Sequence, residues 1–313
     1  MGCDVITIAA GRAQAGWPSS VAGPPPASMS APDYAGALEA VLVQWAADGV
    51  LSVQLNRPEK MNAFNSTLWK EVRTTFEFVK EDADVRVVVI SAVGKNFTAG
   101  LDLSDMSGGE PDKDVGRRAM ATREHVLEIQ ECFNRIEDCG KPVIGCAHGA
   151  CIGAGIDLLS ACDIRYCTTT TKFSIKEVDV GLAADVGTLQ RLPKIVGNDS
   201  IVRELAYTAR MFSADEAEKM GLMGRVFADK EAMDVAAGEL AVLIASKSPI
   251  AVSGTKRNLL YSRDHSVAEG LEYVATWNAA MLQTQDMMVA MKAFFKKDKD
   301  GPKFRPLAPL SKL

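Results

Sequence analysis

Short runs of β-branched and apolar residues alternate with helical patterns over the first two thirds of the chain, and this alternation constrains the fold more than any other feature. The run at 85–91 (VRVVVIS) has the composition of a strand that is buried on both faces. A long helical pattern at about 117–138 follows, and two further strand-like runs occupy 143–147 and 162–167. Because strands that are separated by helices usually pair in parallel, the sequence predicts an α/β core.

Two local signals extend this core toward the N-terminus. The runs 41–43 and 50–55 alternate on either side of Asp48-Gly49, a dipeptide typical of tight hairpin turns. Asn65 is placed to cap a helix that continues to about residue 80, with apolar residues on one face. The sequence therefore predicts a hairpin and a helix ahead of the first buried strand.

Helical patterns dominate the chain after Asp185. They cover about 186–196, 198–208, 213–220, 230–247, 249–262 and 267–295, with one short strand near 225–227. By pattern the chain divides into an N-terminal extension at 1–36, an α/β core at 37–230, a helical region at 231–300 and an extended tail at 301–313. The N-terminal extension is rich in Ala, Gly, Pro and Ser, so we expect it to be disordered because it cannot bury enough apolar surface.

Both ends of the chain carry targeting signals of different strength. Ser311-Lys312-Leu313 is the peroxisomal signal when it stands at a free carboxyl terminus, and the proline-rich tail before it indicates an accessible segment. We therefore expect a peroxisome or peroxisome-like organelle, with the peroxisomal import receptor as a partner. Residues 1–36 are poor in acids but contain a single basic residue, Arg12, so the mitochondrion is only a second candidate site.

Charge and composition disfavour several function classes. With 35 Lys and Arg residues against 40 Asp and Glu, the net charge of −5 disfavours a nucleic-acid-binding protein that works through a positive field. No stretch approaches the ~18 uninterrupted apolar residues that a membrane span requires. The seven cysteines and three histidines show neither zinc-binding nor C-x-x-C spacing, so no metal site is expected.

A glycine-rich turn follows the strand-like run at 143–147 and precedes a helical pattern. Its sequence at 149–155, GACIGAG, has G-x-x-x-G-x-G spacing rather than the G-x-G-x-x-G of dinucleotide-binding turns. The chain also lacks the phosphate-binding loop of NTPases and the G-x-S-x-G nucleophile elbow. What remains is a set of backbone N–H groups at a helix N-terminus, which suits a site where negative charge develops.

Three carboxylates lie near this turn in the sequence. Asp157 stands on the first helical turn after it, Glu177 follows a strand-like segment, and Asp185 is flanked by small and apolar residues. A single acid in a loop is most often a solvated group or a helix cap, but the neighbours of Asp185 favour a pocket. Two carboxylates in one apolar pocket can differ in pKa, so that one accepts a proton while the other donates one.

Longer segments resemble the enoyl-CoA hydratase/isomerase (crotonase) superfamily. The segment 141–166, KPVIGCAHGACIGAGIDLLSACDIRY, resembles its signature, and 97–102, FTAGLD, resembles its acyl-thioester loop. The blocks 176–193 and 260–269 are similar to the dienoyl-CoA isomerase branch, and the whole resemblance spans about 40–295. It implies a crotonase-like spiral of ββα turns with a helical C-terminal trimerisation region, and a homotrimer or homohexamer.

The resemblance also implies a substrate and its binding residues. The substrate is an acyl-CoA, so CoA is part of the substrate and no separate cofactor is expected. The implied binding residues are Ala99, Gly100, Leu101, Asp102, Leu103 and Ala154. Among them, the backbone N–H groups of Leu101 and Ala154 would hold the thioester oxygen, which becomes negative when an enolate forms.

For catalysis the resemblance implies a 1,5-proton shift that turns a 3,5-dienoyl-CoA into a 2,4-dienoyl-CoA in fatty-acid β-oxidation. The catalytic residues would be Glu177, Asp185 and Asp157, of which the first two transfer protons and Asp157 orients or tunes the pair. We place Glu177 at carbon 2 and Asp185 at the distal carbon, and the reverse assignment stays open. Candidates for binding the CoA phosphates are Arg57, Lys60 and Lys95.

Two other functions stay open at this point. The first is a 2-enoyl-CoA hydratase, which in this superfamily holds a water between glutamates at the positions of Asp157 and Glu177; Asp157 is shorter by one methylene group. The second is a non-catalytic acyl-CoA-binding or RNA-binding homologue, which the three acids and the negative net charge disfavour. The preferred acyl-chain length and the choice between trimer and hexamer are not predicted.

Overall fold

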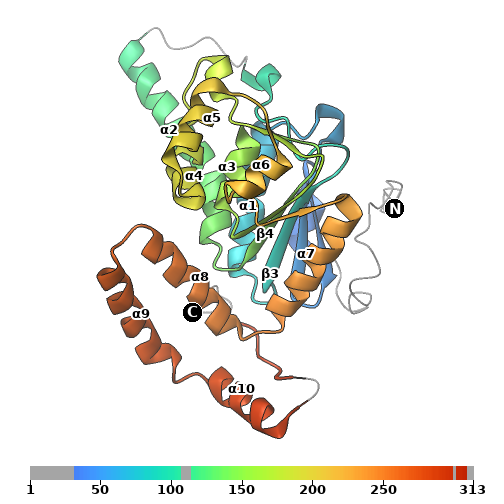
Figure 1. The fold of residues 1–313 in the computed structure, drawn as a ribbon, viewed down its shortest axis with the longest axis vertical. Coiled ribbons are helices and arrows are strands. Elements are labelled where there is room, and N and C mark those ends of the chain that lie inside the picture. Colours follow the sequence, from blue (N-terminus) through green and yellow to red (C-terminus); the bar gives the residue numbers. More distant parts are fainter. Residues whose placement is uncertain (1–31, 107–113, 299–300, 309–313) are drawn as a thin grey trace, which may run out of the picture.

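The computed structural model describes residues 32–106, 114–298 and 301–308 (Figure 1). The predicted N-terminal extension lies outside the described residues except for its last few, which form a short 3-10 helix, Asp33–Ala37. Tyr34 of this helix stacks on Phe78 with 4.8 Å between ring centroids, so ordered structure begins before residue 37. The tripeptide at 311–313 also lies outside the described residues.

A six-stranded sheet forms the centre of the molecule. In spatial order its strands are β1 (Val41–Ala47), β2 (Val50–Leu55), β3 (Val87–Ala92), β4 (Val143–Ala147), β6 (Ile164–Thr168) and β9 (Arg225–Phe227). β1 and β2 form the predicted antiparallel hairpin, and the other neighbouring strands pair in parallel. These pairings confirm the predicted α/β fold class.

Strand β3 shows why the sheet is buried on both faces. Val88 and Ile90 pack into the larger apolar cluster of the core, whereas Val87 and Val89 pack into a second cluster. Helix α7 (Lys230–Ala245) supplies the other side of that second cluster and lies along the sheet in Figure 1. Since alternate side chains of a strand point to opposite faces, a continuous β-branched run fits a strand that is covered twice.

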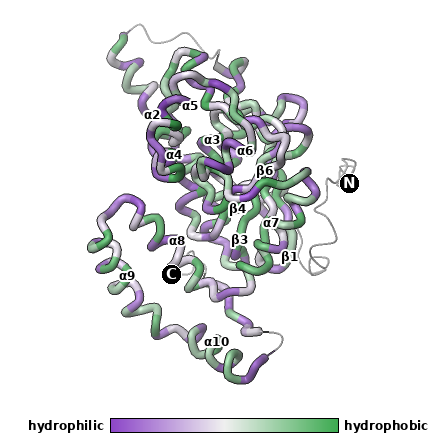
Figure 2. The backbone as a smooth tube through the Cα atoms, in the orientation of Figure 1, coloured by the Kyte–Doolittle hydropathy of each residue, from purple (hydrophilic) through white to green (hydrophobic). Residues whose placement is uncertain are grey.

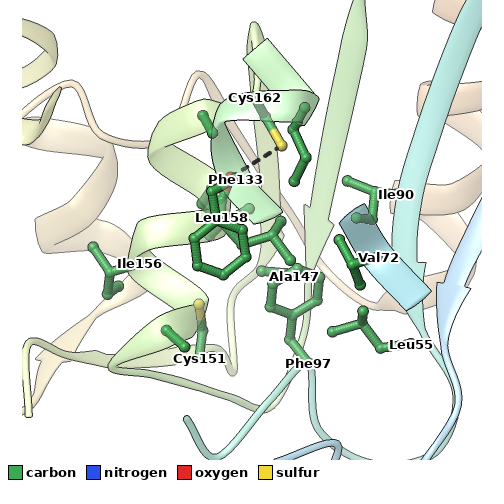
Figure 3. Packing of buried hydrophobic residues seen from close by; sticks show 14 of the residues in the cluster. Leu55, Val72, Ile90, Phe97, Phe133, Ala147, Cys151, Ile156, Leu158 and Cys162 are labelled. Atoms are coloured by element: carbon green, nitrogen blue, oxygen red, sulfur yellow. Dashed lines mark hydrogen bonds between the residues drawn. The ribbon is translucent and has the colours of Figure 1, made fainter. Parts of the chain in front are cut away.

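Three helices cover the opposite face of the sheet. They are α1 (Ser66–Glu81), α2 (Val115–Asp138) and α3 (Ala154–Ala161). Figure 3 shows Val72 of α1 and Phe133 of α2 inside the larger cluster, among side chains from the strands. The predicted cap of α1 is confirmed, because the side chain of Asn65 accepts the N–H of Leu68 at 3.0 Å.

A second, three-stranded sheet lies beside the first. Its strands are β5 (Ala150–Ile152), β7 (Lys172–Ser174) and β8 (Phe212–Ser213). The sequence predicts a glycine-rich turn at the residues of β5, because three residues between glycines carry no periodic pattern. The remaining helices of this region, α4 (Thr188–Val196), α5 (Asp199–Thr208) and α6 (Ala214–Lys219), agree with the predicted ones.

The last three helices lead away from the core (Figure 1). They are α8 (Pro249–Arg263), α9 (Val267–Met281) and α10 (Gln285–Lys296). The prediction of one helix over 267–295 is wrong, because the helix is interrupted between α9 and α10. At the break the side chain of Thr284 accepts the N–H of Asp286 at 3.3 Å and starts a new helix.

Apolar side chains of α9 and α10 remain exposed within one chain, and Figure 2 colours parts of both helices as hydrophobic. No residue of α9 is buried, and the large exposed side chains include Val267, Leu271, Met288, Phe294 and Phe295. Within the described residues no single helix is long and apolar enough to cross a membrane, and α7 and α8 meet that test only as a pair bent by 109°.

Helix α8 is joined to the core through a buried ammonium group. Lys256 is only 5% exposed, and its Nζ donates to Oδ2 of Asp163 at 2.8 Å. The same Nζ donates to the carbonyl oxygens of Ile136 at 3.3 Å and Lys141 at 2.9 Å. A buried cation needs such partners, so these contacts attach α8 to the α/β core.

Candidate active site

A cavity of about 330 Å³ lies between α1, α2, the start of α3 and the segments 99–103 and 176–186. Its walls are mostly apolar. Of the predicted site residues, those that line it are Ala99, Gly100, Leu101, Leu103, Ala154, Glu177 and Asp185. Asp102 and Asp157 do not line it. Among the described residues no group of three or more His, Cys, Asp or Glu side chains is placed to hold a metal ion.

Two backbone N–H groups beside this cavity are free to bind an oxygen. Neither Leu101 nor Ala154 donates its N–H to any partner among the described residues. Ala154 is the first residue of α3, so its N–H has no acceptor within the helix. The loop before Leu101 is held by β5, since Thr98 N donates to Ala150 O at 2.9 Å and Ile152 N donates to Thr98 O at 3.1 Å. The pair therefore suits an oxygen on which negative charge develops.

Gly153 brings the loop, the helix and one carboxylate together. Its φ of 52° lies in the left-handed region, which glycine adopts without strain. A Cβ at this position would lie 3.3 Å from Oε1 of Glu177 and 3.8 Å from Cα of Gly100. The absence of a side chain thus lets Glu177 approach the same backbone that carries the free N–H of Ala154.

Glu177 is half-buried at the inner end of the cavity. It follows β7, and the N–H of Gly153 is tied to that strand through Ser174 O at 2.9 Å. Burial raises the pKa of Glu177 above its usual range, and the negative charge of Asp185 adds to this shift. Its Oε2 is buried without a hydrogen-bond partner among the described residues, so it is available to a substrate. A carboxylate of this kind is a suitable general base.

Asp185 lines the same cavity but is exposed to solvent. Its neighbours Ala184 and Val186 are buried, as their apolar character predicts. The carbonyl oxygen of Asp185 accepts a hydrogen bond from Nε2 of Gln130 on α2 at 2.7 Å. The cavity therefore holds two acid side chains in different surroundings, one half-buried and one at the surface.

Asp157 is fully buried and stays outside the cavity. Its Oδ1 accepts the backbone N–H of Thr188 at 2.6 Å, and its Oδ2 has no partner among the described residues. Burial, followed by the negative charge of Glu177, raises the pKa of Asp157 to about 7. Its contacts fit a group that holds the loop after Asp185 rather than one that touches substrate.

Asp102 also has a supporting position. It forms an ion pair with Arg57 at 3.1 Å and accepts hydrogen bonds from the N–H and the hydroxyl of Ser104 at 3.2 and 2.6 Å. The Ser104 hydroxyl, and then Arg57, hold the pKa of Asp102 below its usual range. Of the three basic candidates for the CoA phosphates, Arg57 is thus engaged by the loop, whereas Lys60 and Lys95 are exposed.

Sequence reasoning missed the apolar wall of the cavity. Trp69 of α1 and Ile129 of α2 line it, and Trp69 packs against the rings of Phe64 and Phe133 at 4.6 and 5.2 Å between centroids. Such residues look like ordinary core positions in a helical pattern, so no signal in the chain distinguishes them. The exposed His125 of α2 also lines the cavity and was not assigned.

Known proteins with similar sequences include isomerases and hydratases. The mitochondrial delta(3,5)-delta(2,4)-dienoyl-CoA isomerase of Homo sapiens is 57% identical over 266 residues, which are 84% of this chain and 80% of the human protein. The peroxisomal isomerase of the same name from Arabidopsis thaliana is 44% identical over 262 residues, 82% of this chain and 93% of the plant protein. The short-chain-enoyl-CoA hydratase of Clostridium acetobutylicum is 32% identical over 80% of this chain and 92% of that protein.

Solved structures share the fold over most of the chain. The enoyl-CoA hydratase of Bacillus anthracis has a TM-score of 0.77 and 28% sequence identity, covering 85% of this chain and 99% of that one. The enoyl-CoA hydratase of Mycobacterium smegmatis has a TM-score of 0.76 and 26% identity, covering 85% and 98%. The enoyl-CoA hydratase/isomerase family itself matches residues 46–305. Because the sequence match and the shared fold each extend over most of its length, the chain belongs to the enoyl-CoA hydratase/isomerase (crotonase) family.

Proposed function

We propose that the chain isomerises 3,5-dienoyl-CoA thioesters to 2,4-dienoyl-CoA by a 1,5-proton transfer between Glu177 and Asp185. The observation that carries this proposal is that both side chains line one cavity together with two free backbone N–H groups. The names of the isomerase relatives support the substrate class. The CoA part of the substrate needs no separate cofactor.

The proposed reaction begins at carbon 2. The N–H groups of Leu101 and Ala154 bind the thioester oxygen, and Glu177 removes a proton from carbon 2. The electron pair that is released spreads over the oxygen and carbons 2, 4 and 6, and the two N–H donors stabilise the negative oxygen. Asp185 then delivers a proton to carbon 6, which leaves double bonds at carbons 2 and 4. The position of Glu177 beside Gly153 and Ala154 supports its assignment to carbon 2.

The exposure of Asp185 suits the second half of this reaction. After turnover Glu177 holds the proton and Asp185 has lost one. The cycle closes when Glu177 gives its proton to solvent and Asp185 takes one up after product release, and the exposed position of Asp185 keeps it in contact with solvent for this step.

A 2-enoyl-CoA hydratase is less well supported. Hydration through two carboxylates needs both of them to face one water in the cavity. Asp157 occupies the position of the second glutamate, but it is buried outside the cavity and bound to the N–H of Thr188. Glu177 and Asp185 are the acids that face a ligand, and their different surroundings fit transfer at two separate carbons.

The variant Asp185→Asn tests the proposal most directly. We expect the appearance of conjugated dienoyl product, followed by its absorbance, to fall ~10²–10⁴-fold, because one general acid is lost. Exchange of the carbon 2 hydrogen in D₂O should continue, since Glu177 and the N–H pair are unchanged. A suitable control is Asp179→Asn, an exposed acid nearby that pairs with Lys176 and does not line the cavity.

Two outcomes of this experiment would change the proposal. Retention of most isomerase activity in Asp185→Asn would contradict the two-acid reaction. Loss of carbon 2 exchange together with isomerisation would instead place Asp185 at carbon 2 and Glu177 at the distal carbon.

Location and assembly extend the proposal. We propose import into peroxisomes by the receptor for Ser311-Lys312-Leu313, a signal that is read only when Leu313 carries a free carboxyl group. A fluorescent fusion that keeps this end free should co-localise with a peroxisomal marker, and deletion of the three residues should abolish this co-localisation.

We also propose a homotrimer or homohexamer, which is supported by the exposed apolar side chains of α9 and α10. Measurement of the molar mass by light scattering would test this assembly.

A further inference from the structure

We propose that a polar stripe on α2, made of Gln130, Asn134 and Glu137, positions Asp185 for the distal proton transfer. This inference rests on the proposed function, because it concerns the acid at the far end of that reaction. The three residues follow one another at intervals of four and three, which places them on one face of the helix. All of them contact the segment 185–191.

The first contact of the α2 stripe is made to Asp185 itself. Gln130 Nε2 donates to the carbonyl oxygen of Asp185 at 2.7 Å. The carboxylate of Asp185, by contrast, has no hydrogen bond or ion pair with any described residue. Its direction therefore depends on how firmly the backbone at this position is held.

The second contact of the α2 stripe is made through Arg191, which is 8% exposed. Its Nη2 donates to Oδ1 of Asn134 at 2.7 Å, and its Nε lies 3.4 Å from Oε2 of Glu137. The guanidinium group of Arg191 packs against the backbone of Gly187 in the turn after Asp185, since a Cβ on Gly187 would lie 2.0 Å from its Nη1. The stripe thus supports the backbone two residues beyond the acid.

A third contact holds the same segment from the other side. The N–H of Thr188 is bound by the buried carboxyl group of Asp157 at 2.6 Å. The segment is therefore fixed by α3 on its inner side and by the α2 stripe on its outer side. Gln130 is the outermost of these contacts and the nearest in sequence to Asp185, so its loss should let the acid move without unfolding the core.

The experiment compares two reactions of one active site. Gln130→Met keeps the approximate size of the side chain but removes the donor, and Gln130→Lys restores a donor, now charged, on a side chain one methylene group longer. In D₂O, carbon 2 exchange reports on Glu177, and formation of conjugated product reports on both acids. Because a displacement of about 1 Å can cost up to ~10²-fold, we expect Gln130→Met to lower isomerisation by about 10-fold.

In the same variant carbon 2 exchange should stay within about 2-fold of the unchanged protein, so the ratio of exchange to isomerisation rises. Gln130→Lys should recover most of the lost isomerisation. Glu128→Met, at an exposed position of α2 that does not line the cavity, is the control for the substitution itself. Its exchange and isomerisation should both remain normal.

Three results separate this inference from the proposed function. Equal losses of exchange and isomerisation in Gln130→Met would mean a general structural role and would overturn the inference. Normal isomerisation in Gln130→Met, beside an inactive Asp185→Asn, would overturn the inference and leave the proposed function standing. Normal isomerisation in Asp185→Asn would overturn both.

Discussion

The inner end of the cavity and its outer lip are built in opposite ways. At the inner end, Glu177 is half-buried against Gly153 and next to the free N–H of Ala154. At the outer lip, Asp185 is exposed and its backbone is held by separate hydrogen bonds to other elements. Burial therefore raises the pKa of Glu177 and restricts its position, whereas a hydrogen bond to the main chain holds the backbone of Asp185. Substitutions at the two places should have different effects.

The largest expected effect is at the inner end. Glu177→Gln removes the proposed base at carbon 2, so both carbon 2 exchange and isomerisation should fall by ~10²–10⁴-fold. This differs from Asp185→Asn, where only isomerisation should fall. Exchange is measured by mass spectrometry of the recovered thioester. Persistent exchange in Glu177→Gln would show that the two ends of the cavity have been assigned the wrong way round.

A smaller effect is expected when a methyl group is added beside Glu177. Gly153→Ala places a Cβ about 3.3 Å from Oε1 and forces alanine to a φ of 52°. We expect a loss of about 10–100-fold in both exchange and isomerisation, because the carboxylate is displaced. Steady-state kinetics on a dienoyl-CoA substrate would measure it.

Gly181→Ala is the matched control, at a glycine that does not line the cavity. Its φ of 84° carries a similar backbone penalty, but a Cβ there meets no atom within 4 Å. A loss as large as that of Gly153→Ala would show that backbone strain, rather than contact with Glu177, limits the activity of both variants.

The smallest expected effect concerns Asp157, which connects the two ends. Its pKa is about 7 in the folded chain and about 4 when unfolded, so the folded state retains a proton that the unfolded state loses. This group therefore favours folding at low pH, and the free energy of unfolding decreases as the pH rises through 7. Between pH 5 and pH 8 the free energy of unfolding should therefore fall by about 1–3 kcal/mol less in Asp157→Asn than in the unchanged protein, as measured by urea unfolding. The same pH dependence in both proteins would contradict the assigned burial.

Most of the fold follows from the sequence because its signals are local. The β-branched run that became β3, the hairpin turn at Asp48-Gly49 and the cap at Asn65 each depend on a few neighbouring residues. The break between α9 and α10 was missed because the apolar pattern continues through it. Strand β5 was missed because it is three residues long.

The site was predictable only in part, for a related reason. The three acids stood out by their position near the glycine-rich turn, and the family resemblance added the two N–H groups. Glu177 and Asp185 line one cavity together with Leu101 and Ala154, whereas Asp157 does not. The burial of Asp157, the engagement of Asp102 by Arg57 and the role of Trp69 in the wall depend on contacts between distant segments. No local pattern encodes such contacts.

The ammonium group of Lys256 determines how freely the two parts of this chain can be exchanged with those of its relatives. Removing everything from α8 onward would strip Asp163 of its cation and leave the carbonyl oxygens of Ile136 and Lys141 with only the weak thiol donor of Cys139. A chimaera that takes its last three helices from another protein must therefore bring a lysine of equal reach. Without this lysine, the new helices would destabilise the α/β core, which the exchange leaves unchanged in sequence.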